Sequence, residues 1–161
     1  MSLYAELEVT TNFSFLRSAS HPAEMAKAAA ALGLAAMAVA DRNTLAGVVR
    51  AHQAAKQAGI KLVVGARLDL RDAPSLLCFP TDRAAYGRLS KLITLGRRRA
   101  AKGDCEIYLE DVFAHSGGQL FIYLPPKESE RELDTAYTAH LHRLREVLGR
   151  DVWIAACCRY D

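Results

Sequence analysis

The sequence has little of what marks fibrous, disordered or membrane-spanning chains. Proline occurs 5 times and glycine 10 times in 161 residues, without a repeat, which excludes a collagen-like or low-complexity chain. The longest apolar run, Leu32–Ala40, is far shorter than the about 20 residues that span a bilayer. The first residues also lack the basic, apolar and small-residue succession of a signal peptide. These absences predict a globular, soluble protein with no membrane contact.

Cysteine is scarce and carries no metal-binding spacing. The four cysteines are Cys78, Cys105, Cys157 and Cys158, and no two of them form a Cys-x-x-Cys pair. This pattern argues against a thiolate metal site and fits a reducing compartment. We therefore expect the protein in the cytoplasm.

Excess charge of one sign is also small, with a net charge of +3. A strong, clustered excess of Lys and Arg is the usual footprint of a nucleic-acid binder, so a small nucleic-acid-binding module acting alone is expected to bind only weakly. One local run could still contact DNA phosphates without sequence preference, or simply be a solvated helix end. Its residues are Arg88, Lys91, Arg97, Arg98, Arg99 and Lys102.

What the sequence does contain is an alternation of strand and helix patterns. Period-two or short apolar runs predict strands, and apolar residues at helical spacing predict helices. The predicted strands are 4–9, 34–40, 60–70, 76–79, 119–124 and 152–158, with 34–40 and 152–158 buried; the predicted helices are 21–33, 44–58, one beginning at Thr81-Asp82, and 129–148. This order implies an α/β fold with mostly parallel strands, as a barrel or an open sheet. The length suits one domain.

The segment Tyr4–Pro22 resembles the opening of the PHP (polymerase and histidinol phosphatase) domain of bacterial replicative and error-prone polymerases. Its Asn-Phe-Ser-Phe-Leu-Arg run, followed by Ala-Ser-His-Pro, is most similar to the error-prone branch, which is related to the DNA polymerase III alpha subunit. The stretches 40–47, 59–68 and 79–89 continue the likeness over nearly the whole chain.

This resemblance implies a distorted seven-stranded β/α barrel, which in metal-bearing members holds divalent metals at the carboxyl ends of its strands and hydrolyses phosphoesters. The sequence stops before the last strands of such a barrel. We therefore expect residues 1–161 to form a single PHP-like domain with an incomplete barrel, truncated before its last strands. The likeness also suggests a piece of a longer polymerase, excised or naturally shortened.

By resemblance, the family's metal ligands fall on positions that mostly cannot bind metal here. The matching residues are Glu8, Thr10, Arg17, Asp41, Arg42 and Arg67. Arginine offers no lone pair and repels a dication, so we expect a degenerate site without metal. Glu8 and Asp41 would then be salt-bridge partners of arginines. Two alternatives stay open: one weakly held ion at Glu8 and Asp41, or a phosphate bound by the guanidinium groups.

The function that the resemblance implies is that of the N-terminal PHP domain of an error-prone, translesion DNA-directed DNA polymerase of the damage response. The intact parent would be a nucleotidyltransferase with magnesium in its polymerase domain, whereas this chain would have no catalytic residue and no cofactor. It would be a non-hydrolytic structural and interaction domain; the alternative is a metal-dependent phosphoesterase of the same fold.

The resemblance also implies partners. These are the remainder of the polymerase chain, DNA through the parent, a sliding clamp and accessory damage-response factors. Self-association is a further expectation, because an apolar stripe at helical spacing would be partly exposed if neighbouring strands are missing. The stripe consists of Leu133, Tyr137, Leu141, Leu144 and Leu148.

Overall fold

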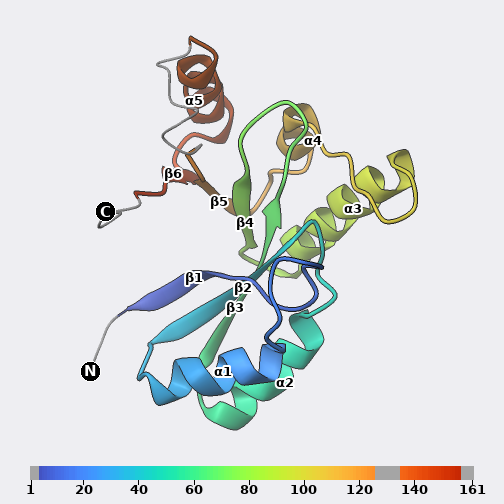
Figure 1. Ribbon diagram of the computed structural model, residues 1–161. Coiled ribbons are helices and arrows are strands. Elements are labelled where there is room, and N and C mark those ends of the chain that lie inside the picture. Colours follow the sequence, from blue (N-terminus) through green and yellow to red (C-terminus); the bar gives the residue numbers. More distant parts are fainter. Residues whose placement is uncertain (1–3, 126–134, 157–161) are drawn as a thin grey trace, which may run out of the picture. The chain divides into compact units, whose positions relative to one another are not determined.

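The computed structural model describes residues 4–125 and 135–156, without the side chains of 135–137 (Figure 1). The chain divides into two compact units, Met1–Arg67 and Leu68–Asp161, which we call the N-terminal and C-terminal units. Each unit is considered by itself. None of the helices in these described ranges has the length and apolarity of a bilayer-crossing segment.

The N-terminal unit is built from three parallel strands and two helices. Its strands are β1 (Ala5–Val9), β2 (Ala36–Arg42) and β3 (Lys61–Leu68), and its helices are α1 (Pro22–Ala31) and α2 (Val48–Ala58). β2 pairs with β1 on one side and β3 on the other, with Arg42 opposite Arg67 in register. The carboxyl ends of parallel strands meet at one edge of a sheet, so the ends of β1, β2 and β3 are brought together.

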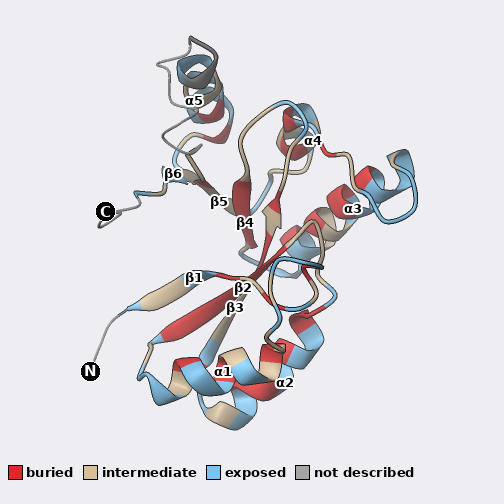
Figure 2. Cartoon of the chain, viewed as in Figure 1, coloured by how far each residue is buried: buried red, intermediate tan, exposed pale blue. Residues whose placement is uncertain are grey.

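The core of this unit depends on small side chains. β2 is buried along almost its whole length (Figure 2), and α1 packs against α2. Ala26, Ala51 and Ala55 let the helices approach the apolar side chains of Met37 and Val39 closely. His21 caps the start of α1: its Nδ1 accepts the Ala23 N–H at 3.3 Å, while Glu24 accepts the His21 N–H at 2.7 Å. These two bonds form a capping box.

The described part of the C-terminal unit combines three strands with three helices. They are β4 (Leu76–Pro80), α3 (Arg83–Arg99), α4 (Leu109–Ala114), β5 (Gln119–Tyr123), α5 (Thr135–Leu148) and β6 (Val152–Ile154). β5 pairs antiparallel with β4 and parallel with β6. The core gathers Phe121 and Tyr123 of β5 with Leu89 of α3 and Ile107, all at most 1% exposed.

Within the described residues the predicted elements are all present, with three differences; residues 129–134 of the predicted helix 129–148 lie outside that part. α4 was not predicted, because six residues are too short to establish a helical period. β6 ends at Ile154, and residues 157 and 158 lie outside the described part. The expectation of a buried strand there is wrong: Trp153 and Ile154 are 52% and 56% exposed, because β6 pairs with β5 alone among the described residues.

The stripe on α5 is only partly open to solvent. Leu144 and Leu148 are buried and Leu141 is half-buried, while Leu133 and the side chain of Tyr137 lie outside the described residues. Leu141 and Leu144 line a hollow of about 490 Å³ together with Trp153 and Ile154. Self-association through this face stays a prediction.

The end of α3 is tied to the start of α4 by an ion pair. Arg99 donates two hydrogen bonds to the Asp111 carboxylate, at 2.7 and 3.1 Å, and the Tyr108 N–H donates a third at 3.0 Å. The hydrogen-bonded Arg99 guanidinium holds the pKa of Asp111 below its usual range. The carboxylate therefore stabilises the fold in its ionised form.

This arrangement predicts a pH-dependent loss of stability. Because the pKa is lower in the folded state, the contribution is full above the ordinary carboxyl pKa and disappears as pH falls through the folded value. Asp111→Asn should lower the free energy of unfolding by about 1 kcal/mol at neutral pH, since the pair is partly exposed. When unfolding in urea is measured at acid pH, the difference in free energy of unfolding between the original chain and Asp111→Asn should disappear. Asp104→Asn, at an exposed position, is the control, and an equal deficit at both pH values would contradict the assignment.

Candidate functional site

Asp41, at the end of β2, is a buried carboxylate with three hydrogen bonds from one loop. Asp41 is only 1% exposed to solvent. Oδ1 accepts the Thr11 N–H at 2.8 Å and the Ser14 hydroxyl at 2.6 Å, and Oδ2 accepts the Thr11 hydroxyl at 2.7 Å. Thr11 and Ser14 are themselves 0% and 3% exposed. Both carboxylate oxygens are therefore engaged by the segment that follows β1.

The loop is packed tightly around this carboxylate. Ser14 Oγ also accepts the Arg42 N–H at 3.0 Å, and Thr11 Oγ1 accepts the Phe13 N–H at 3.2 Å. A Cβ on Gly47 would lie 3.0 Å from Asp41 Oδ2 and 3.0 Å from the Phe13 ring. Such contacts are too close for most side chains, so glycine at position 47 is what lets the chain before α2 approach the loop.

The tip of the loop is exposed and apolar. Phe15 and Leu16 are 84% and 86% exposed, and Leu16 has a φ of 59°, in the left-handed region. A branched residue is rarely found there and costs roughly 1–2 kcal/mol. The turn is closed by backbone bonds from Arg17 N to Ser14 O at 3.0 Å and from Asn12 N to Ser20 O at 2.9 Å. The bonds to Asp41 thus hold a loop that presents two apolar side chains to solvent.

Glu8 and Arg67 form an ion pair between the ends of β1 and β3. Arg67 Nη1 lies 2.6 Å from Glu8 Oε1, and the two side chains are 22% and 39% exposed respectively. A partly exposed pair of this kind contributes at most about 1 kcal/mol. The salt bridge expected for Glu8 is present, whereas Asp41 takes hydroxyl and amide donors in place of a guanidinium.

The remaining predicted positions are less closely involved. Thr10 is half-buried and Arg17 exposed, and among the described residues neither side chain has a hydrogen bond or ion pair. Arg42 is half-buried, directly after Asp41. Sequence reasoning missed Thr11 and Ser14. Both stood in the motif that follows β1, but matching by position drew attention to Thr10 instead.

The donor set of this site does not fit a divalent metal. Glu8 is paired with Arg67, and Asp41 has both oxygens occupied by Thr11 and Ser14. Arginine at three of the matching positions adds positive charge and no lone pair. In the part of the chain that the structure describes, no group of three or more His, Cys, Asp or Glu side chains could hold a metal ion.

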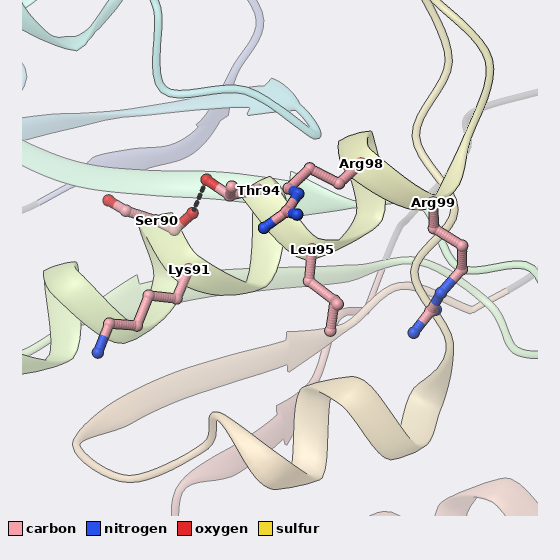
Figure 3. A pocket seen from close by; sticks show the side chains of 6 residues that line it. All are labelled: Ser90, Lys91, Thr94, Leu95, Arg98 and Arg99. Carbon is pink, nitrogen blue, oxygen red and sulfur yellow. Dashed lines mark hydrogen bonds between the residues drawn. The ribbon is translucent and has the colours of Figure 1, made fainter.

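The predicted basic residues lie on α3 and just beyond it, in the C-terminal unit. A groove of about 660 Å³ runs along this helix (Figure 3), lined by Ser90, Lys91, Thr94, Leu95, Arg98 and Arg99. Arg88 lies outside the groove and donates from Nε to the Gly117 carbonyl at 2.6 Å. Lys102 is exposed beyond the helix. Some cations of this run are therefore hydrogen-bonded within the protein, and others face solvent.

Comparison with known proteins gives one family. Residues 6–150 match the PHP domain. The chain is 52% identical over 159 residues to an error-prone DNA polymerase of Caulobacter vibrioides and 48% identical over 156 residues to an error-prone DNA polymerase 2 of Agrobacterium fabrum. These alignments take in 98% and 97% of the chain. The chain spans 14% of the length of each of these curated relatives.

Solved structures share the fold. One, from Bifidobacterium adolescentis and provisionally named a metal-dependent phosphoesterase, superposes with a TM-score of 0.73 at 16% identity, over 96% of this chain and 77% of the other. An amidohydrolase from Chromobacterium violaceum, described with bound sulfate and no metal, gives 0.70 at 15% identity, over 93% and 75%. Within the units, three of the four strand pairings are parallel. The predicted α/β fold of PHP type, with mostly parallel strands, is confirmed.

The hydrogen bonds to Asp41 predict unequal effects at two adjacent threonines. Thr11→Val removes the hydroxyl that serves a buried carboxylate and should lower the free energy of unfolding by about 1–3 kcal/mol. Thr10→Val, with no such bond, should change it by no more than about 0.5 kcal/mol. Urea unfolding of both variants measures the difference. Equal effects would contradict the role given to Thr11.

Proposed function

The chain belongs to the PHP domain family, and from that membership we propose that it is the N-terminal PHP domain of an error-prone, damage-response DNA polymerase. In this proposal it is a non-hydrolytic domain that braces the rest of the polymerase. The observation that carries the proposal is the engagement of Asp41 by Thr11 and Ser14, which turns a family metal position into the anchor of a loop.

The proposal assigns nucleotidyl transfer to chain outside these 161 residues. The relatives are named error-prone DNA polymerases, and the chain spans only 14% of their length. The magnesium-binding carboxylates of the polymerase reaction, the contacts to a sliding clamp and those to accessory damage-response factors would lie in the remainder. The intact polymerase would act on DNA in the cytoplasm, and this domain would supply no catalytic residue.

An interaction role is supported by the loop tip. Phe15 and Leu16 expose large apolar side chains that would be unfavourable in water without a partner. The left-handed Leu16 adds local strain, and strained loops persist where surrounding bonds fix them. We assign the tip to an apolar surface on the remainder of the polymerase chain. That partner is favoured because most of the length of the relatives lies outside this domain.

The alternative function is a metal-dependent phosphoesterase of the same fold. The name of the solved Bifidobacterium protein favours it, but at 16% identity that likeness concerns the fold alone. A hydrolytic site would require free carboxylate or imidazole donors converging on a metal. Glu8 and Asp41 are both engaged within the protein, which supports the non-hydrolytic proposal.

The bracing role predicts an effect that appears only in the longer protein. Phe15→Ser combined with Leu16→Asn removes the apolar tip, and asparagine tolerates the left-handed conformation. The free energy of unfolding of the 161-residue chain, measured in urea, should not fall, because asparagine relieves the strain of about 1–2 kcal/mol that leucine has in the left-handed conformation. In the polymerase that carries this domain, the half-life of DNA synthesis activity on heating should fall several-fold.

Leu32→Ser provides the matched control, since Leu32 is 74% exposed at the end of α1, away from the loop tip in sequence. It should leave the half-life of the polymerase unchanged. If the double variant and the control behave alike in the polymerase, the loop tip is not the bracing contact.

A further inference from the structure

We propose that the outer face of α3 binds the phosphate backbone of nucleic acid, with Lys91 and Arg98 as the contacting residues. The first observation is the distribution of charge. The 17-residue helix carries six basic residues and no acidic one. The whole chain has a net charge of +3, so the rest of it is net negative. Positive potential is therefore concentrated on this helix.

The second observation is that some cations of α3 are bonded to other groups of the protein and others are not. Arg99 is bonded to Asp111 and lies over the Tyr108 ring at 5.1 Å, and Arg88 is bonded to the Gly117 carbonyl. Lys91 and Arg98 have no hydrogen bond or ion pair within the described residues. Figure 3 shows the Arg98 side chain folded back along the helix toward Thr94. These two cations are available to an external anion.

The helix dipole explains only part of this cluster. Cations in the last turn, such as Arg97 and Arg98, are stabilised by the partial negative charge at the carboxyl end. That effect falls off within one turn, and Lys91 lies about two turns earlier. Like charges on one helix face destabilise it when no counter-charge is present. A polyanion along the groove would remove that repulsion.

The spacing of the two residues suits a nucleic-acid strand. Lys91 and Arg98 are seven residues apart and therefore lie on one face, separated by about 10 Å along the axis. That length corresponds to the axial rise of roughly three nucleotides of one strand in B-form DNA, at about 3.4 Å each. Leu95 lies between them and is 38% exposed. None of the described residues that line the groove is acidic.

The groove offers little for reading bases. Its hydroxyl groups are directed inward: Thr94 donates to the Ser90 carbonyl at 2.8 Å and Ser90 to the Tyr86 carbonyl at 2.9 Å. Among the residues that the structure describes, no asparagine or glutamine, the residues that read adenine edges, lines the groove. Binding should therefore be weak, salt-sensitive and independent of sequence. The surface on α3 does not include the loop tip, and nucleic-acid binding there is a role beyond bracing.

The test measures binding of the 161-residue chain to a short fluorescent single-stranded oligonucleotide by anisotropy, between about 50 and 200 mM salt. Lys91→Gln combined with Arg98→Gln should reduce the slope of log K against log salt by about 1.4, which is two contacts at about 0.7 each. The charge-conserving exchange of Lys91→Arg with Arg98→Lys should keep the slope. Unchanged thermal unfolding would establish that each variant is folded.

Lys27→Gln combined with Lys56→Gln is the control, because it removes the same charge from exposed positions on α1 and α2. It should leave the slope unchanged. The proposal is overturned if this control lowers the slope as much as the α3 variant does. It is also overturned if polyglutamate of equal charge displaces the oligonucleotide equally well, since an acidic protein would then be the partner. Neither result bears on the loop tip at Phe15 and Leu16.

Discussion

A buried carboxylate must be supplied with hydrogen-bond donors, and Asp41 receives its donors from the loop that follows β1. Thr11 and Ser14 provide three of them, which also fixes where the loop can lie. The close approach at Gly47 and the exposed position of Phe15 follow from the same contact. The same bonds bear on the chemistry of the site, because both oxygens of the Asp41 carboxylate already accept hydrogen bonds from the protein. One interaction thus determines where the loop and its apolar tip lie.

The two units contribute differently to the proposed role. In the N-terminal unit, the strand ends carry an ion pair, Glu8 with Arg67, and a hydrogen-bonded carboxylate, Asp41. Neither arrangement needs a ligand from outside. In the C-terminal unit, positive charge is gathered on one helix, and Arg99 is fixed by Asp111 at its end. A domain of the proposed non-hydrolytic kind would in this way present two surfaces for binding, one apolar and one cationic.

Much of the fold could be predicted from the sequence because its periodic signals are strong. The apolar run ending at Asp41 and the amphipathic pattern of 83–99 identify β2 and α3 directly. α4 could not be predicted, since one and a half turns leave no period, and the exposure of Trp153 depends on which strands flank β6. At the site, residue types at family positions indicated that Arg17, Arg42 and Arg67 could not be ligands. They could not identify Thr11, because its role depends on the path of the loop and not on its spacing from a motif.

The central claim is that Asp41 holds a loop and does not bind a metal. The most direct test is thermal unfolding of the 161-residue chain and of Asp41→Asn, each with and without excess Zn²⁺ or Mn²⁺. Metal bound at a hundred times its Kd would stabilise the fold by about 2.7 kcal/mol, which for a chain of this size is several degrees in Tm. The account predicts a metal-induced change of less than about 1 °C in both proteins. A rise of several degrees in the original chain that Asp41→Asn abolishes would contradict it.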